Sequence, residues 1–130
     1  MRSRHDAMHA ALAKLRGAAV AAAWIDVGRG ELTFSGVGNV AGRRLAGGDT
    51  AGLISRMGIV GGTMAPSARV HPVRVSWSSG ATLVLASDGL GTQWKPDRVL
   101  AARHPAVAAG VLLRDHARDT DDVTVVVVRG

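Results

Sequence analysis

The stretch LVLASDGLGTQW, residues 83–94, passes directly from an apolar strand pattern into a charged residue, Asp88. A second stretch, RDTDDVTVVVV at 118–128, has the reverse order, with acids ahead of a run of valines. Short apolar runs rich in valine and leucine are typical of buried β-strands. Asp favours turns because its side chain accepts hydrogen bonds from nearby backbone amides. Each stretch therefore predicts a buried strand with an acidic turn at one end.

The two acidic strand ends meet if the strands pair in antiparallel fashion, because the end of one strand then lies beside the start of the other. Clustered carboxylates repel one another unless a cation neutralises them. Hard divalent ions such as magnesium and manganese take carboxylate oxygens as ligands. The sequence therefore predicts a metal site at Asp88, Asp121 and Asp122. Ordinary turn chemistry at each strand end is the alternative.

The remaining patterns outline a fold around these two strands. Apolar or alternating runs predict strands at 18–27, 31–40, 50–55, 69–77, 82–87 and 123–128. A helix is predicted at 5–16, and two more begin at Pro96 and Pro105, because proline is well accepted at the first helical position. Turn residues at 28–30 and 78–80 predict hairpins. Such short connections, followed by helices and a returning strand, indicate an α+β layered domain of antiparallel strands.

The composition restricts the class of protein. A chain of 130 residues predicts a single domain, 1–130. It has no cysteine, so a bound metal would need oxygen or imidazole ligands. No apolar run approaches the roughly 20 residues of a membrane span, and the N-terminal residues lack the apolar centre of a secretory signal. We therefore expect a soluble cytoplasmic protein without a membrane partner.

The net charge of +6 suggests a third possibility, a basic nucleic-acid-binding domain. The excess lies in the first 80 residues, which hold ten Lys or Arg against four acids. However, 14 of the 16 basic residues are Arg in a chain rich in Ala and Gly, which indicates a general compositional bias. With one Phe and no Tyr, the chain offers few side chains to stack on bases. No nucleic-acid partner is expected.

Two further motifs, and the context of the serines, predict no catalytic residue. HDAMH, residues 5–9, has the histidine spacing of zinc proteases but carries Asp6 in place of Glu and lacks a third ligand. GVGNVAG, residues 36–42, departs from the glycine spacing of dinucleotide-binding loops and predicts a glycine-rich hairpin bend. No serine has the G-x-S-x-G context of a hydrolase elbow.

Taken together and in order, four segments resemble those of the metal-dependent (PPM-type) serine/threonine phosphatases: GVGN (36–39), GIVGG (58–62), LVLASDGL (83–90) and DDVTVVVVR (121–129). The resemblance is closest to the SpoIIE-like, RsbX-like bacterial branch, and it runs from about residue 7 to residue 129. It implies a layered α-β-β-α sandwich of antiparallel strands. It also implies two manganese or magnesium ions that activate a water, which attacks a phosphoserine or phosphothreonine.

The resemblance gives roles to the acids at the strand ends. Asp88 matches the family's late metal aspartate, and Asp121 matches the other aspartate on the same ion. Asp122 is then a neighbour of the ion or a weaker ligand. The glycines of GVGN and GIVGG match structural turns. The implied partner is a phosphorylated anti-sigma-factor antagonist or a stressosome-type protein.

The sequence departs from the family at its start. Two metal-binding segments, an early aspartate and an Asp-Gly that bridges both ions, should precede the helix at 5–16, and neither Asp6 nor Asp26 has that glycine context. We therefore expect a domain that is incomplete at the N-terminus and holds half a metal site. The alternative function is a catalytically inactive, truncated phosphatase-like module that binds a signalling partner. Its exposed sheet edges would be covered by a dimer partner or an upstream domain.

Overall fold

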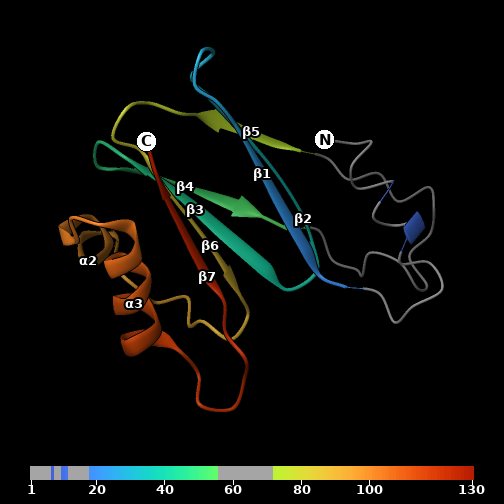
Figure 1. The fold of residues 1–130 in the computed structure, drawn as a ribbon, viewed down its shortest axis with the longest axis vertical. Coiled ribbons are helices and arrows are strands. Elements are labelled where there is room, and N and C mark those ends of the chain that lie inside the picture. The colour runs from blue at the N-terminus through green and yellow to red at the C-terminus, as the bar shows by residue number, and fades with distance from the viewer. Residues whose placement is uncertain (1–6, 8–9, 12–17, 56–71) are drawn as a thin grey trace.

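Two antiparallel β-sheets and two helices make up the part of the chain that the computed structural model describes, residues 18–55 and 72–130 with positions 7, 10 and 11 (Figure 1). The first sheet has three strands in the order β1 (Val20–Asp26), β2 (Glu31–Val37) and β5 (Val73–Ser76). The second has four strands in the order β4 (Asp49–Ile54), β3 (Val40–Ala46), β6 (Thr82–Ser87) and β7 (Val125–Arg129). Every strand pair is antiparallel, which confirms the predicted α+β class.

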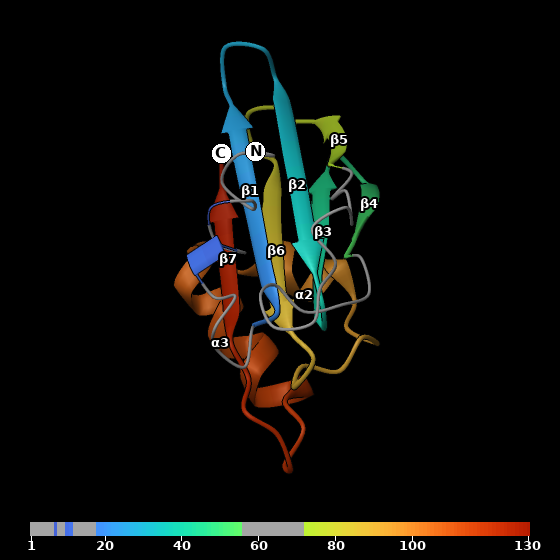
Figure 2. The same cartoon turned by 90° about the vertical axis from the view of Figure 1, so that its right-hand side faces the viewer.

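The sheets stack face to face, and α2 (Pro96–Ala101) and α3 (Pro105–His116) cover the outer face of the four-stranded sheet (Figure 2). Both helices begin at the prolines from which they were predicted. Most of the helix predicted at 5–16 lies outside the described residues, as do both histidines of HDAMH and the glycines of GIVGG. The described layers are therefore sheet, sheet and helix.

Two hydrophobic cores hold the layers together. The inter-sheet core contains buried side chains from both sheets: Leu32, Phe34, Leu53, Trp77, Ala81 and Leu83. The helix-side core lies between the four-stranded sheet and the helices: Leu45, Val84, Leu90, Trp94, Val99, Ala108 and Leu112. Each fully buried Leu, Val or Phe stabilises the fold by about 1.5–3 kcal/mol relative to an exposed side chain. The alternation along β6, with Leu83 facing one core and Val84 the other, is the period-2 pattern of a strand covered on both faces.

The turn at 28–30 is a hairpin as predicted, because it joins β1 to β2, which pair along their whole length. The prediction of a hairpin at 78–80 is wrong. This turn joins β5 to β6, and these strands belong to different sheets. Trp77 and Ala81 on either side of the turn are both buried in the inter-sheet core, so the chain crosses between the layers here. Turn residues look alike in both kinds of connection.

The glycine-rich stretch at 36–42 also crosses between the sheets. The chain bends at Gly38, whose φ of 92° favours glycine, and then begins β3 in the other sheet. The predicted bend is therefore present, but the predicted hairpin is wrong. The strand β3 itself was not predicted, because Arg43 and Arg44 interrupt its apolar pattern.

The pairing of β6 with β7 confirms that the two acidic strand ends lie side by side. The ladder ends at the pair Ala86 and Val125, just before the acids are reached. Two further hydrogen bonds extend the contact: the Ser87 amide donates to the Thr124 carbonyl at 3.0 Å, and the Thr124 amide donates to the Ser87 hydroxyl at 2.9 Å. The turn residues beyond the strands are therefore held next to each other.

Candidate metal site and adjoining pocket

The backbones on either side of the acids are in direct contact. Asp88 directly follows β6, and Asp121 and Asp122 lie in the turn before β7. A Cβ atom placed on Gly89 would lie 2.2 Å from the Asp122 carbonyl oxygen, so only glycine fits at this position. The structure thus brings the three predicted residues to one end of the four-stranded sheet.

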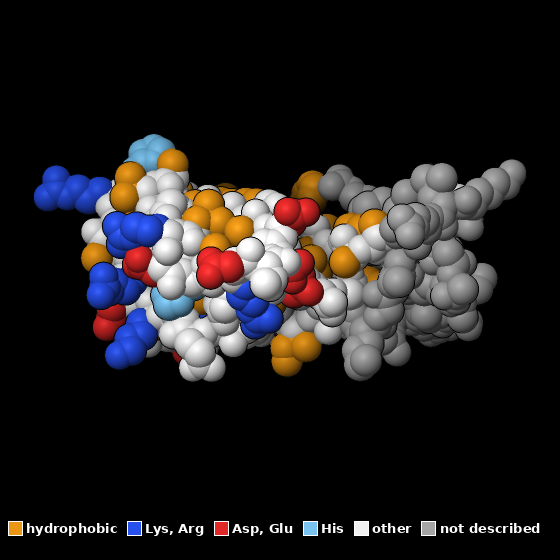
Figure 3. Space-filling view, turned by 90° about the horizontal axis from the view of Figure 1, so that it is seen from below, with side chains coloured by type: hydrophobic (Ala, Val, Ile, Leu, Met, Phe, Trp, Pro, Cys, Tyr) orange, Lys and Arg blue, Asp and Glu red, His pale blue; other side chains and the backbone are white. Residues whose placement is uncertain are grey.

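All three acidic side chains are exposed at that end. Figure 3 views this end of the molecule and shows Asp and Glu side chains near its middle, with Lys and Arg gathered on the helical side. Within residues 18–55 and 72–130, no three His, Asp or Glu side chains are grouped closely enough to hold a metal ion by themselves. Magnesium typically takes one or two carboxylates and keeps several waters. The carboxylate oxygens at this end are therefore of the donor type that a divalent ion prefers.

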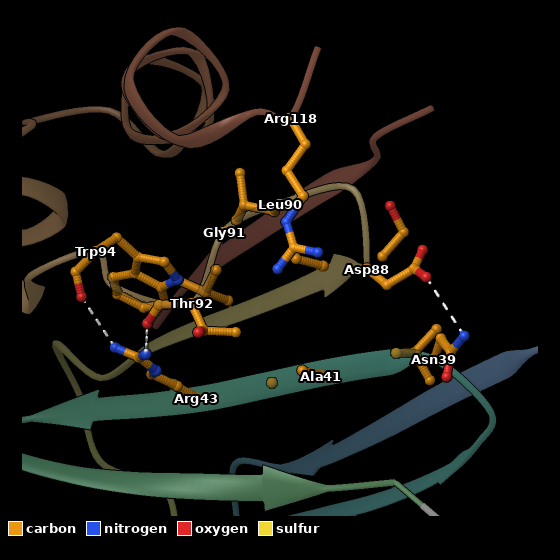
Figure 4. A pocket seen from close by; sticks show the side chains of 14 residues that line it. Asn39, Ala41, Arg43, Asp88, Leu90, Gly91, Thr92, Trp94 and Arg118 are labelled. Carbon is orange, nitrogen blue, oxygen red and sulfur yellow. Dashed lines mark hydrogen bonds between the residues drawn. The ribbon is translucent and has the colours of Figure 1, made fainter. Parts of the chain in front are cut away.

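Asn39 orients the first of these carboxylates. Its Nδ2 donates a hydrogen bond to Oδ2 of Asp88 at 3.3 Å, across the gap between the β2–β3 connection and the end of β6 (Figure 4). The bend at Gly38 places Asn39 there. The sequence pattern predicted a glycine-rich bend at this segment, and Asn39 was not among the predicted site residues. The feature of the sequence that could have indicated Asn39 is a polar residue in a glycine-rich turn between two strands.

A pocket of about 250 Å³ adjoins Asp88 on the helix-facing side of the four-stranded sheet. Its floor consists of small and apolar side chains of β3 and β6, among them Ala41, Val84 and Ala86. The loop after β6 and the residue Arg118 form its walls (Figure 4). The full lining is Asn39, Val40, Ala41, Gly42, Arg43, Val84, Ala86, Ser87, Asp88, Leu90, Gly91, Thr92, Trp94 and Arg118.

One wall of the pocket is fixed by Arg43. Its guanidinium lies 4.0 Å from the centre of the Trp94 ring, within the range of a cation–π contact. The same guanidinium donates from Nη1 to the Trp94 carbonyl at 3.1 Å and from Nη2 to the Thr92 carbonyl. Arg43, which interrupted the strand pattern in the sequence, therefore holds the loop at 92–94 against β3.

The opposite wall is fixed by backbone pairing between the loop after β6 and the end of α3. The Arg118 amide donates to the Gly89 carbonyl at 2.8 Å, and the Gly91 amide donates to the His116 carbonyl at 2.8 Å. These bonds place Arg118 beside the strand end that carries Asp88. Arg118 was not among the predicted site residues, although it lies only three residues before Asp121.

No protein-family model and no curated protein sequence matches the chain. Several solved structures are similar to the chain in fold. One, described as "The bacterial stressosome: a modular system that has been adapted to control secondary messenger signaling", has a TM-score of 0.87 at 23% identity, covering 98% of this chain and 67% of that one. RsbX in complex with magnesium has a TM-score of 0.80 at 17% identity, covering 96% and 62%.

The phosphatase domain of the cell fate determinant SpoIIE from Bacillus subtilis has a TM-score of 0.65 at 21% identity, covering 100% of this chain and 65% of that one. The chain has a PPM-type phosphatase fold. The resemblance predicted from the ordered motifs is thus confirmed at the level of the fold. The chain spans about two thirds of the length of these structures. Among the described residues, no helix is long and apolar enough to cross a membrane.

Proposed function

We propose that this PPM-type phosphatase fold acts as a cytoplasmic, metal-dependent protein-phosphoserine or phosphothreonine phosphatase of bacterial signalling. One observation carries the proposal: the pairing of β6 with β7, which holds the turn after Asp88 against the backbone of Asp122. The likeness in fold to RsbX and to the SpoIIE phosphatase domain supports it. Clustered carboxylates repel one another, and a shared cation would neutralise that repulsion.

In this proposal Asp88 and Asp121 hold a magnesium or manganese ion, and Asp122 is a neighbour or a weaker ligand. The solved RsbX structure contains magnesium. A bound divalent ion supplies Lewis-acid polarisation of a phosphoryl oxygen. The hydrogen bond from Asn39 fixes the Asp88 carboxylate and leaves its other oxygen free to face the ion.

The proposed substrate is a phosphorylated anti-sigma-factor antagonist or a stressosome-type protein. This assignment rests on the similarity to a structure described under the bacterial stressosome and to RsbX. A phosphoprotein substrate also agrees with the exposure of the acids, because a phosphorylated side chain can reach an open strand end without entering a deep cleft.

A second candidate function is a phosphatase-like module that binds a signalling partner without catalysis. The limited number of acids grouped within the described residues favours it, since two bridged metal ions need more carboxylates. The uncovered valines of β7 also favour it, because Val126 is 47% exposed and Val128 is 37% exposed. A second copy or an upstream domain that packs against this face of β7 would cover them.

Hydrolysis assays on the 130-residue chain distinguish the two candidates. An aryl phosphate and a phosphoserine-bearing stressosome-type protein are each incubated with manganese and with wild type, Asp88→Asn or Asp121→Asn. Asp119→Asn, an exposed acid in the same loop as Asp121, is the matched control. The phosphatase proposal expects turnover in wild type and Asp119→Asn and at least about a hundredfold less in the other two variants. Absence of turnover in all of them would favour the binding module.

A further inference from the structure

The guanidinium of Arg118 is available to bind a ligand. Within residues 18–55 and 72–130 its side chain makes no hydrogen bond, ion pair or ring contact. Arg43, the other arginine of the pocket, already donates to two carbonyl oxygens and stacks on Trp94. The pocket therefore contains Arg43, whose donors hold other parts of the fold, and Arg118, whose side-chain donors have no partner among the described residues.

The position of Arg118 is set by the backbone. Ala117 ends α3 and forms an isolated β-bridge with Leu90, and the Arg118 amide then donates to the Gly89 carbonyl. These contacts hold its Cα beside the strand end that carries Asp88. In Figure 4 the Arg118 side chain extends from the end of α3 toward β3, between Leu90 and Asp88. Its free donors thus face the space next to the candidate metal ligand.

The chemistry of this space suits a tetrahedral oxyanion. A guanidinium presents paired N–H donors whose spacing matches phosphate oxygens, so it binds phosphate in bidentate fashion. The floor below it consists of small and apolar side chains. Because Asp88 lies on the far side of the same space, an anion there would contact Arg118 on one side and a cation held by Asp88 on the other.

We propose that Arg118 binds the phosphoryl group of the substrate, and that the pocket between Arg118 and Asp88 is a phosphate-binding subsite. The inference rests on the proposed phosphatase function and deepens it. It makes Arg118 a binding residue for the substrate, separate from the metal ligands. It also predicts that phosphate binding in this pocket depends on the charge of Asp88. The Asp88 carboxylate repels a phosphate dianion unless a cation or a substitution removes its charge.

The first test measures binding of inorganic phosphate by calorimetry, which requires no turnover. Phosphate is titrated into the magnesium-loaded wild type, Arg118→Ala, Arg118→Lys and Arg103→Ala. Arg103 is exposed and lies outside the pocket, so its variant controls for the loss of one positive charge. We expect affinity to fall roughly tenfold or more in Arg118→Ala, less in Arg118→Lys, and little in Arg103→Ala. Equal losses in the Arg118→Ala and Arg103→Ala variants would overturn the proposal, because net charge alone would then explain them.

A second pair of variants keeps the inference testable if the chain binds no metal. Without metal, Asp88→Asn should bind phosphate more tightly than wild type, and Asp88→Asn with Arg118→Ala should lose that gain. Phosphate binding that is the same with and without Arg118, or absent from Asp88→Asn, would overturn the subsite. Failure of the phosphatase proposal has a different signature: no metal binding and no turnover, with phosphate binding to Asp88→Asn intact.

A third arm identifies which anion the subsite prefers. A phosphoserine peptide and the same peptide with glutamate in place of phosphoserine are titrated into wild type and Arg118→Ala. We expect the phosphopeptide to bind at least about tenfold more tightly, and this preference to shrink in Arg118→Ala. Equal affinity for the two peptides in wild type would contradict a phosphoryl-binding role.

Discussion

The two faces of β7 differ in how far they are covered, although both consist of valine. Val125 and Val127 pack against the helix-side core beneath α3. Val126 and Val128 point to the opposite face, where they are 47% and 37% exposed. Their cross-strand partners on β6, Leu85 and Leu83, nevertheless belong to the inter-sheet core. The helix-side core is therefore complete among the described residues, whereas the inter-sheet core ends at β6.

This difference shows that the burial of a valine on β7 depends on whether another layer packs against its face, because both faces have the same residue type. The three-stranded sheet ends at β1 on the side where the four-stranded sheet ends at β7, as Figure 2 shows. The same strand pair, β6 and β7, carries both the uncovered valines and the acidic ends. The candidate site therefore lies at the end of a strand pair whose helix-side face is covered and whose opposite face is partly exposed at β7.

The largest expected effect tests the completeness of the helix-side core. Leu112 is fully buried in it, whereas the adjacent Leu113 is 36% exposed. Replacing Leu112 by Ala should lower the free energy of unfolding by about 2–5 kcal/mol, because the removed methyl groups leave a cavity. Leu113→Ala should cost less than about 1 kcal/mol. Urea denaturation followed by circular dichroism measures both, and equal losses would mean that this core is not closed.

The next effect concerns the end of the strand pair. Gly89→Ala forces a Cβ against the Asp122 carbonyl, so the two strand ends must separate. We expect a loss of about 1–3 kcal/mol in stability together with weaker metal binding. Gly52→Ala on the edge strand β4 is the control, because a Cβ there meets no atom within 4 Å. A Gly89→Ala chain as stable as Gly52→Ala would show that the strand ends are not in contact.

A smaller effect compares the two faces of β7 directly. Thr has nearly the shape of Val but adds a hydroxyl, which is costly only where it is buried without a partner. Val127→Thr should therefore destabilise the fold by about 1 kcal/mol more than Val126→Thr. Thermal unfolding at several protein concentrations measures the difference. If Val126→Thr is the more harmful change, and increasingly so at high concentration, a second copy covers that face.

The smallest effect lies on the outward face of α3, remote from both cores. Arg114 donates to Asp115 from Nε at 2.7 Å and from Nη2 at 3.1 Å, and these hydrogen bonds lower the pKa of the Asp115 carboxyl. A carboxyl whose pKa is lowered by folding contributes stability above its unfolded-state pKa, and the contribution disappears as pH falls through the folded-state value. Asp115→Asn should thus be slightly less stable than wild type at pH 7 and equally stable near about pH 2. A difference that persists at the low pH would exclude the ion pair as its cause.

The parts of the fold that the sequence predicted are those set by local patterns. Pro96 and Pro105 mark the helix starts, and the apolar runs before Asp88 and after Asp122 mark β6 and β7. The strand β3 was missed because its arginines have partners only in the folded chain, where Arg43 reaches Trp94 across 51 residues. The connections at Gly38 and at 78–80 were misassigned because turn residues do not encode which sheet the next strand joins.

The residues of the candidate site also fall into those that local sequence patterns predict and those that only the folded chain brings together. The placement of Asp88, Asp121 and Asp122 at one end of the sheet could be predicted, because an antiparallel pair in this register puts the end of one strand beside the start of the other. The hydrogen bond from Asn39 to Asp88 joins residues 49 apart, and it depends on a crossing between sheets that the sequence does not reveal. Arg118 likewise faces the pocket only because the end of α3 pairs with the loop after β6.

The most direct test of the account is a calorimetric titration of manganese into wild type, Asp88→Asn, Asp121→Asn, the double variant and Asp119→Asn. If Asp88 and Asp121 hold one ion together, wild type and Asp119→Asn bind manganese, and each single substitution weakens binding at least about tenfold. The double variant then loses little more than either single variant, because both side chains serve the same ion. Unchanged binding in Asp88→Asn and Asp121→Asn, or losses that simply add, would contradict a shared metal site at the ends of β6 and β7.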